Sequence, residues 1–301
     1  MGKELVVMAY KTKGIDISRY QGTPDFSKVK ESVDYVIVQI GYGKYSTQMD
    51  SQFKYNYTNC RKNNIPIGGY WYSYARSVDE ARLEARACLE AIRGMKFEYP
   101  IYYDLEEGLG SLGRSLVSNI AIAFCTELEK SGYFTGIYIS RSPAQSYLTD
   151  DVCKKYALWL AEYGSQLNWS GPVGMWQYSS TGRVSGINGN VDMNYCYEDY
   201  PTLIKTAGLN GYTKPPVNTM DLDGFKQGDK NLGVLAYKQL LVIAHNAKII
   251  TQKVDNNNSF GEGTTKATNE FLKSIGKNQN GIAGVNTIQA LGAKLKEVVL
   301  K

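Results

Sequence analysis

The stretch Tyr-Pro-Ile-Tyr-Tyr-Asp-Leu-Glu, residues 99–106, decides the fold. It is rich in β-forming residues, and apolar residues at helical spacing follow it from Leu116 to Lys130. Strand-like runs recur at residues 14–18, 35–41, 66–73, 135–140, 156–162, 173–179 and 190–197. Eight strands with incomplete helix coverage predict an α/β fold, an irregular, incomplete (β/α)8 barrel of about 210 residues.

Two further helices are expected between the strands. Residues Met49–Asn63 carry one helical pattern. Ser77-Val-Asp-Glu80 has the sequence of a capping box and precedes apolar residues at helical spacing up to Ile92. The last strands follow one another with little room for helices, so the helix layer is expected to be incomplete there.

Acidic residues stand within three of the predicted strands, where they are unfavourable: Asp16, Asp104 with Glu106, and Asp192. Side chains alternate along a strand, so Asp104 and Glu106 are expected to share one face. One such aspartate alone is best explained by a solvated sheet edge. Four acids at the same end of barrel strands predict an active site, because such barrels carry their chemistry at the C-terminal ends of strands.

Paired carboxyl groups suit the hydrolysis of a glycosidic bond, in which a protonated carboxyl group gives its proton to the leaving oxygen. The only histidine is His245, so residues 1–212 hold no Ser-His-Asp apparatus. The five cysteines form no C-x-x-C pair and are expected to be buried thiols. We therefore expect no metal and no cofactor.

Aromatic residues gather near the predicted strand ends and offer faces on which sugar rings stack. They are Tyr42, Tyr70, Trp71, Tyr72, Tyr74, Trp159, Tyr163, Trp176 and Tyr178. From this set we predict six substrate-binding residues: Tyr42, Tyr70, Trp71, Tyr72, Trp176 and Tyr178.

The composition changes near residue 212. Residues 213–301 carry 12 Lys and 7 acidic residues, which accounts for the net charge of +5, whereas all Arg, Trp and Cys lie before residue 213. A short stiff segment with Pro215-Pro216 lies at this change. We predict a catalytic barrel at residues 1–211, a linker at 212–220 and a second domain at 221–301.

The charge and hydropathy patterns narrow the partners and the location. The basic tail lacks arginine, so nucleic acid is not expected as a partner. No apolar run is long enough to cross a membrane, and the run Leu5–Tyr10 is too short for a secretion signal. Val6 stands where a myristoylation motif needs Ser or Thr. We expect synthesis in the cytoplasm without a signal peptide; the oligomeric state stays open.

The acidic motifs resemble glycoside hydrolase family 25, the Chalaropsis-type lysozymes or N-acetylmuramidases. The resemblance rests on Gly14-Ile-Asp-Ile-Ser18, Tyr102-Tyr-Asp-Leu-Glu106, Leu158-Trp-Leu-Ala161 and the stretch Trp176–Asn194. It implies a flattened barrel that cuts the bond from N-acetylmuramic acid to N-acetylglucosamine, with Glu106 as proton donor, Asp104 as its acidic partner, and Asp16 and Asp192 completing the site. Trp71 stands where the family usually has a groove-lining histidine.

The tail is similar to the three-helix peptidoglycan-binding domain type 1. The resemblance rests on the stretches Gly233–Leu241, Ser259–Leu272 and Asn280–Leu291. It implies a small all-α domain that binds the cell wall. Thr264 is expected to cap the second helix, and His245 to lie near the end of the first.

Together the resemblances imply a phage endolysin that acts on bacterial peptidoglycan in the cell wall. A secreted-type bacterial autolysin and an inactive glycan-binding protein are the alternatives, and the intact acidic pair argues against the second. A chitinase-like enzyme is disfavoured because the resemblance extends beyond the Asp-x-Glu motif. Several acids without an obvious separate nucleophile favour net retention, assisted by the substrate's 2-acetamido group.

Overall fold

The computed structural model describes residues 11–214 and 224–299. The chain divides into two compact units, with the division between Pro215 and Pro216. Most of the predicted linker 212–220 lies outside the described residues, as does the N-terminal stretch with Leu5–Tyr10 and Val6. Within the described residues, no helix is long and apolar enough to cross a membrane.

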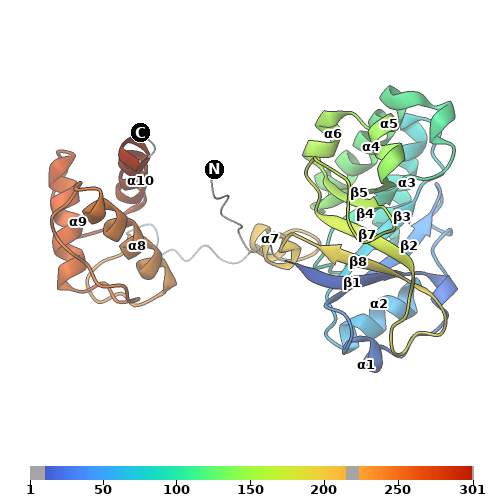
Figure 1. Cartoon of the computed structure of the whole chain (residues 1–301), viewed down its shortest axis with the longest axis horizontal. Coiled ribbons are helices and arrows are strands. Elements are labelled where there is room, and N and C mark those ends of the chain that lie inside the picture. The colour runs from blue at the N-terminus through green and yellow to red at the C-terminus, as the bar shows by residue number, and fades with distance from the viewer. Residues whose placement is uncertain (1–10, 215–223, 300–301) are drawn as a thin grey trace. The chain divides into compact units, whose positions relative to one another are not determined.

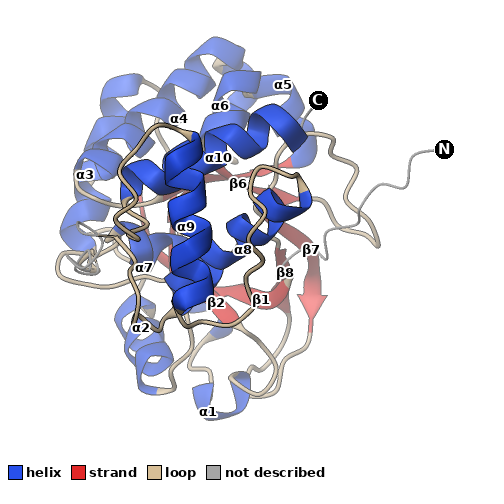
Figure 2. Ribbon diagram, turned by 90° about the vertical axis from the view of Figure 1, so that its left-hand side faces the viewer, coloured by secondary structure: helices blue, strands red, loops and turns tan. Residues whose placement is uncertain are grey.

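Eight strands close into a barrel in the order of the sequence (Figures 1 and 2). From β1 to β7 neighbouring strands run parallel, whereas β8 runs antiparallel to both β7 and β1. The strands are β1 (Thr12–Ile17), β2 (Tyr35–Tyr42), β3 (Ile67–Tyr72), β4 (Ile101–Asp104), β5 (Thr135–Ser140), β6 (Ala157–Ala161), β7 (Met175–Gly182) and β8 (Val191–Cys196). The predicted fold class is confirmed, and its irregularity lies in the reversed β8.

Helices connect most of the parallel strands and pack outside the barrel. They are α1 (Phe26–Val29), α2 (Phe53–Lys62), α3 (Val78–Ala91), α4 (Gly113–Lys130), α5 (Arg141–Tyr147) and α6 (Asp150–Lys155), with α7 (Tyr200–Ala207) after the last strand. The side chain of Ser77 caps α3, as expected. The Glu80 carboxylate accepts the backbone N–H of Arg76 instead, so the predicted capping box is only half formed.

The alternation of strand side chains sorts the core into two layers. Inside the barrel lie aromatic rings such as Tyr102, Tyr138 and Trp159, which pack on one another. Outside lie the aliphatic neighbours of these residues, such as Ile101 and Ile137, packed in a second cluster with residues of the surrounding helices. The bulky rings fill the barrel interior, so the open space is left at its rim.

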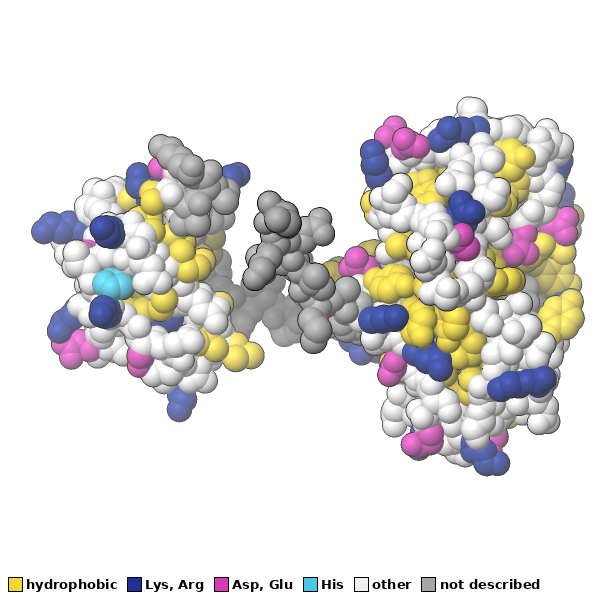
Figure 3. All heavy atoms as spheres, in the orientation of Figure 1, with side chains coloured by type: hydrophobic (Ala, Val, Ile, Leu, Met, Phe, Trp, Pro, Cys, Tyr) yellow, Lys and Arg dark blue, Asp and Glu magenta, His cyan; other side chains and the backbone are white. Residues whose placement is uncertain are grey.

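No helix connects β6 with β7 or β7 with β8 among the described residues. On the outer face of these strands the Tyr178 ring stacks on Tyr195 at 4.5 Å between ring centres, and the Lys11 ammonium lies over Tyr195. Figure 3 shows hydrophobic side chains, with basic ones beside them, on the face where β1 and β8 lie. The antiparallel β7–β8 pair is therefore packed by its own aromatic side chains.

Within residues 224–299, the second unit contains three helices around a small apolar core, as expected: α8 (Leu232–Asn246), α9 (Glu262–Ser274) and α10 (Val285–Val299) (Figure 2). Phe271 and Leu291 lie in this core, and His245 lies in the last turn of α8. The expected cap at Thr264 is wrong. The helix begins at Glu262 with Gly261 as its N-cap, and Thr264 is a buried residue inside α9.

Candidate active site

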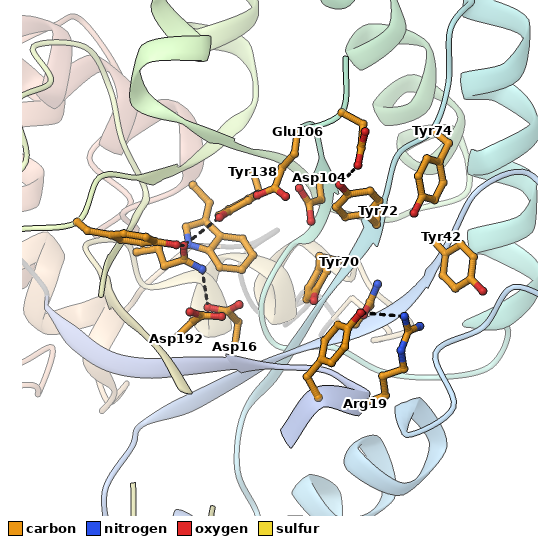
Figure 4. Close-up of a pocket in the computed structure, with 16 residues that line it drawn as sticks. Asp16, Arg19, Tyr42, Tyr70, Tyr72, Tyr74, Asp104, Glu106, Tyr138 and Asp192 are labelled. Carbon is orange, nitrogen blue, oxygen red and sulfur yellow. Dashed lines mark hydrogen bonds between the residues drawn. The ribbon is translucent and has the colours of Figure 1, made fainter. Parts of the chain in front are cut away.

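A cleft of about 540 Å³ opens at the rim of the barrel, and all four predicted acids line it (Figure 4). Asp16 and Asp104 lie near or at the C-terminal ends of β1 and β4. Asp192 is the second residue of β8, and the reversed direction of β8 brings it to the same end of the barrel. The structure therefore brings together acids that are up to 176 residues apart in the chain.

Asp16 and Asp192 are paired residues of the antiparallel β1–β8 ladder. Asp16 is buried, and its Oδ2 accepts hydrogen bonds from the side-chain amides of Asn194 at 2.7 Å and Gln177 at 3.0 Å. Burial and the neighbouring Asp192 nevertheless raise the pKa of Asp16, and burial raises the pKa of Asp192. Because two neighbouring negative charges repel each other, this pair of carboxyl groups favours the state in which the two share one proton.

Asp104 is the last residue of β4 and is 5% exposed. Its Oδ1 has no hydrogen-bond partner among the described residues, although it is buried. Burial, then Glu106 and Asp16, raise the pKa of this carboxyl group well above its ordinary value. A buried acceptor without a partner is costly, so Asp104 is suited to receive a hydrogen bond from a ligand.

Glu106 lies two residues beyond the end of β4, whereas the sequence predicted a strand up to this residue. The backbone N–H of Leu105 still bonds to the carbonyl of Tyr138, which continues the ladder past Asp104. Glu106 therefore reaches the same cleft as Asp104 and keeps an exposed side. The cleft walls remove part of its hydration, which raises the pKa of Glu106. Asp192 adds to this rise, and the nearby Tyr138 hydroxyl group opposes it.

The aromatic predictions divide by the face of the strand. Tyr42, Tyr70 and Tyr72 line the cleft. Trp71 lies between two of these residues in β3, so its side chain points to the other face of the sheet, where it is fully buried and donates its indole N–H to the Gly43 carbonyl at 2.9 Å. The expectation that Trp71 lines the substrate cleft is therefore wrong.

The expectation that Trp176 and Tyr178 lie in the substrate cleft is also wrong. Trp176 is 6% exposed, and its indole N–H donates to the Glu162 carbonyl at 2.7 Å. Tyr178 lies at an irregularity in the β7–β8 register and stacks on Tyr195 outside the barrel. Neither side chain contributes to the lining of the cleft.

Several cleft residues were not among the predicted site residues. Gln177 links the site, because it donates to Asp16 and accepts the hydroxyl hydrogens of Tyr138 at 2.9 Å and Tyr163 at 3.2 Å. Side chains alternate along a strand, so Asn194 lies on the same face of β8 as Asp192. This alternation could have identified Asn194 from the sequence as a neighbour of the acidic site. The other unpredicted lining residues are Arg19, Tyr20, Gln39, Tyr74, Glu107 and Trp159.

Among residues 11–214 and 224–299, no group of three or more His, Cys, Asp or Glu side chains is arranged to hold a metal ion. Asn194 lies behind Asp16 and accepts the indole N–H of Trp159 through its Oδ1 at 2.8 Å. Its amide is thereby oriented to donate to Asp16, so the barrel interior fixes the position of this carboxyl group.

Comparison with known proteins places this site in a family. The family model described as Glycosyl hydrolases family 25 matches residues 15–187. The autolytic lysozyme of Clostridium acetobutylicum is 33% identical over 184 residues, which cover 60% of this chain and 55% of that protein. The chain thus spans about half the length of this curated relative.

Two solved structures are also similar to the chain. The modular autolysin LytC of Streptococcus pneumoniae, in complex with a synthetic peptidoglycan ligand, has a TM-score of 0.57 and 31% identity over 62% of this chain and 47% of its own. The CTP1L endolysin has a TM-score of 0.59 and 20% identity, over 95% of this chain and 99% of its own, a likeness of fold. Since the family model covers more than half of the chain, the protein belongs to glycosyl hydrolase family 25.

Proposed function

We propose that the protein is an N-acetylmuramidase that hydrolyses the β-1,4 bond between N-acetylmuramic acid and N-acetylglucosamine in bacterial peptidoglycan. The observation that carries the proposal is the acidic cleft, in which Asp16, Asp104, Glu106 and Asp192 meet beside tyrosine faces. Family membership supports it, as does the ligand of the LytC structure.

Glu106 is the proton donor in this proposal. A general acid must hold its proton until the leaving oxygen takes it, and the raised pKa of Glu106 favours this protonated form. Its exposed side gives a glycosidic oxygen access to the carboxyl group. The neighbouring carboxyl groups stabilise the positive charge that develops on the sugar ring.

Asp104 orients the substrate in the same proposal. Its unpartnered Oδ1 is suited to accept the N–H of the 2-acetamido group of muramic acid. That contact would direct the acetamido carbonyl toward the anomeric carbon and stabilise the oxazolinium ion that forms there. Water then opens this ion from the face that the leaving group left, so the net outcome is retention.

The second unit is the wall-binding module of this enzyme, at residues 221–301, and the whole chain is an endolysin in this proposal. The support is the three-helix core together with the fold-level likeness to the CTP1L endolysin over nearly the whole chain. A bacterial autolysin remains the alternative, because the Clostridium relative is an autolytic lysozyme.

The decisive experiment is mass spectrometry of purified peptidoglycan digested by the full chain. A new reducing end on muramic acid supports the proposal, whereas a new reducing end on N-acetylglucosamine contradicts it.

Glu106→Gln should lower the lysis rate by at least about 100-fold without altering the fold, because it removes the transferable proton. The matched control is Glu90→Gln on the exposed face of α3, which should lyse cell walls normally. Lysis by Glu106→Gln at the normal rate would assign the proton to another group.

Deletion of residues 221–301 tests the wall-binding role. It should weaken sedimentation with intact cell walls more than it slows cleavage of a small soluble muropeptide, because a second contact raises the effective concentration without altering the chemistry. Unchanged sedimentation would rule out this role.

A further inference from the structure

Arg19 is the single cation among the described residues that line the cleft. Five carboxyl groups line the same cleft: Asp16, Asp104, Glu106, Glu107 and Asp192. Arg19 forms no salt bridge with any described residue. An arginine that lines an acidic cleft without an acidic partner has its charge available for a ligand.

The backbone of Arg19 is held firmly. The backbone N–H of Arg19 donates at 3.1 Å to the carboxylate of Asp50, which is 2% exposed. Ser18 caps the short turn Arg19–Gln21, and its own N–H donates to the Gln21 side chain at 2.9 Å. The side chain therefore projects from a fixed point at the end of β1, two residues after Ile17.

The Arg19 guanidinium is positioned by aromatic rings. Its carbon lies 4.9 Å from the ring centre of Tyr20 and 6.0 Å from that of Tyr42, and Nη2 donates to the Tyr20 hydroxyl at 3.1 Å. No other side-chain hydrogen bond of Arg19 is formed within the described parts of the chain. Tyr20 and Tyr42 thus orient the group, while most of its five N–H donors remain for a planar acceptor such as a carboxylate.

Figure 4 shows Arg19 near Tyr42 and Tyr70, on the side of the cleft away from Asp16 and Asp192. Where a peptide is attached, the lactyl carboxyl group of muramic acid is part of an amide and is uncharged, so the carboxylates of peptide-bearing glycan belong to the peptides. The five acids repel such a carboxylate from the rest of the cleft. Arg19 offers it one attractive position, displaced from the reacting bond.

We propose that Arg19 binds a carboxylate of the peptide attached to muramic acid and thereby makes peptide-bearing glycan the preferred substrate. The proposal rests on the proposed muramidase function and deepens it, because it names which form of the polymer the cleft selects. Arg19 is a specificity-determining residue in this account, and the bond cleavage itself stays with the acids.

The test uses one preparation of soluble peptidoglycan strands divided into two portions. One portion is treated with an amidase to remove the peptides, and the lactyl carboxyl groups that this releases are then converted to uncharged amides. The quantity measured is the ratio of kcat/KM on peptide-bearing strands to kcat/KM on stripped strands. Arg19→Gln should lower this ratio about tenfold, because the charge-assisted hydrogen bonds to the carboxylate are lost. Arg19→Lys, which keeps the charge but not the planar fork, should fall between Arg19→Gln and the unaltered protein.

The matched control is Arg86→Gln on the exposed face of α3, which should leave the ratio unchanged. Raising the ionic strength from about 0.01 M to about 1 M should lower the preference of the unaltered protein, because the contact lies at an exposed rim. An unaltered ratio in Arg19→Gln, with normal cleavage of both portions, overturns the role of Arg19 and leaves the muramidase proposal standing. If the unaltered protein cleaves neither portion, the proposed function itself fails.

Discussion

The two units of the molecule each bury a charged side chain, and they treat it in opposite ways. In the helical unit, Lys238 of α8 is 1% exposed, and its ammonium group donates to Asp255, to Asn257 at 2.9 Å and to the Ser259 carbonyl at 2.9 Å. In the barrel, Asp104 is 5% exposed, and its Oδ1 has no partner among the described residues.

The difference separates a structural charge from a functional one. Three donors meet three acceptors at Lys238, so the loop from Asp255 to Ser259 is fixed against α8 and the charge is fully compensated. Among the described residues that line the cleft, Arg19 is the single cation and forms no salt bridge with the carboxyl groups, so the fold holds these groups together at a cost in stability. Such uncompensated charged groups indicate a binding site, in which a ligand supplies the interactions that the protein does not.

The largest effect is expected at Asp104. Asp104→Asn should lower the lysis rate about 10³-fold, because a neutral amide stabilises the developing positive charge poorly. The same change should raise the Tm of the barrel by about 2–4 °C, since it removes a buried acid from repulsion by its neighbours.

Calorimetry and a turbidity assay on the same samples measure both quantities for Asp104→Asn. Asp151→Asn, an exposed aspartate in α6, is the control and should alter neither. A drop in both activity and Tm would place Asp104 with the structural charges.

Lys238→Ala should destabilise the helical unit by about 3 kcal/mol, because it removes a fully compensated buried group and leaves the Ser259 carbonyl without its donor. In calorimetry of the full chain, the transition of the helical unit should move down while that of the barrel stays in place. Lys253→Ala, at an exposed position, is the matched control. An unaltered transition would mean that this ammonium group contributes nothing net to folding.

The smallest effect is the dependence of barrel stability on pH. The pKa values of Asp16, Asp104, Glu106 and Asp192 are all raised in the folded state. The folded chain therefore holds protons that the unfolded chain releases near pH 4. The contribution of these protonated carboxyl groups to folding stability is complete below about pH 4 and is lost as the pH rises through the raised pKa values.

We expect the barrel to lose stability as the pH rises between about pH 5 and pH 8. Thermal unfolding followed across this range measures the slope, and the double variant Asp16→Asn, Asp104→Asn should flatten it. A slope of the opposite sign would mean that ionised, compensated carboxylates dominate the site.

The sequence was informative where periodicity and chemistry coincide. Period-two alternation placed Asp104 and Glu106 in one cleft, and the same rule, applied to β3, would have excluded Trp71 in favour of Tyr70 and Tyr72. The role of Asn194 as a donor to Asp16 depends on a ladder between strands almost 180 residues apart, which no local pattern encodes.

Other features escaped prediction because tertiary packing outweighed local propensity. Gly261 and Gly263 suggested that α9 starts at Thr264, yet the buried side of the helix begins there, and the turn before it forms despite Gly263. No local sequence pattern distinguishes the turn that contains Arg19. This residue lies in the cleft because the closure of the barrel brings the end of β1 beside the other strand ends.

The reversal of β8 also determines where the chain enters and leaves the barrel. Cys196 at the end of β8 pairs with Thr12 at the start of β1, so both ends of the barrel chain emerge at the edge opposite the Asp16–Asp192 pair. The following residues cover that edge, where the Asn210 side chain bonds to the backbone of Phe134 and Tyr99. The points where the chain enters and leaves the barrel therefore lie at the end of the strands away from the acidic cleft, and further residues can be joined there without altering the ladder that pairs Asp16 with Asp192.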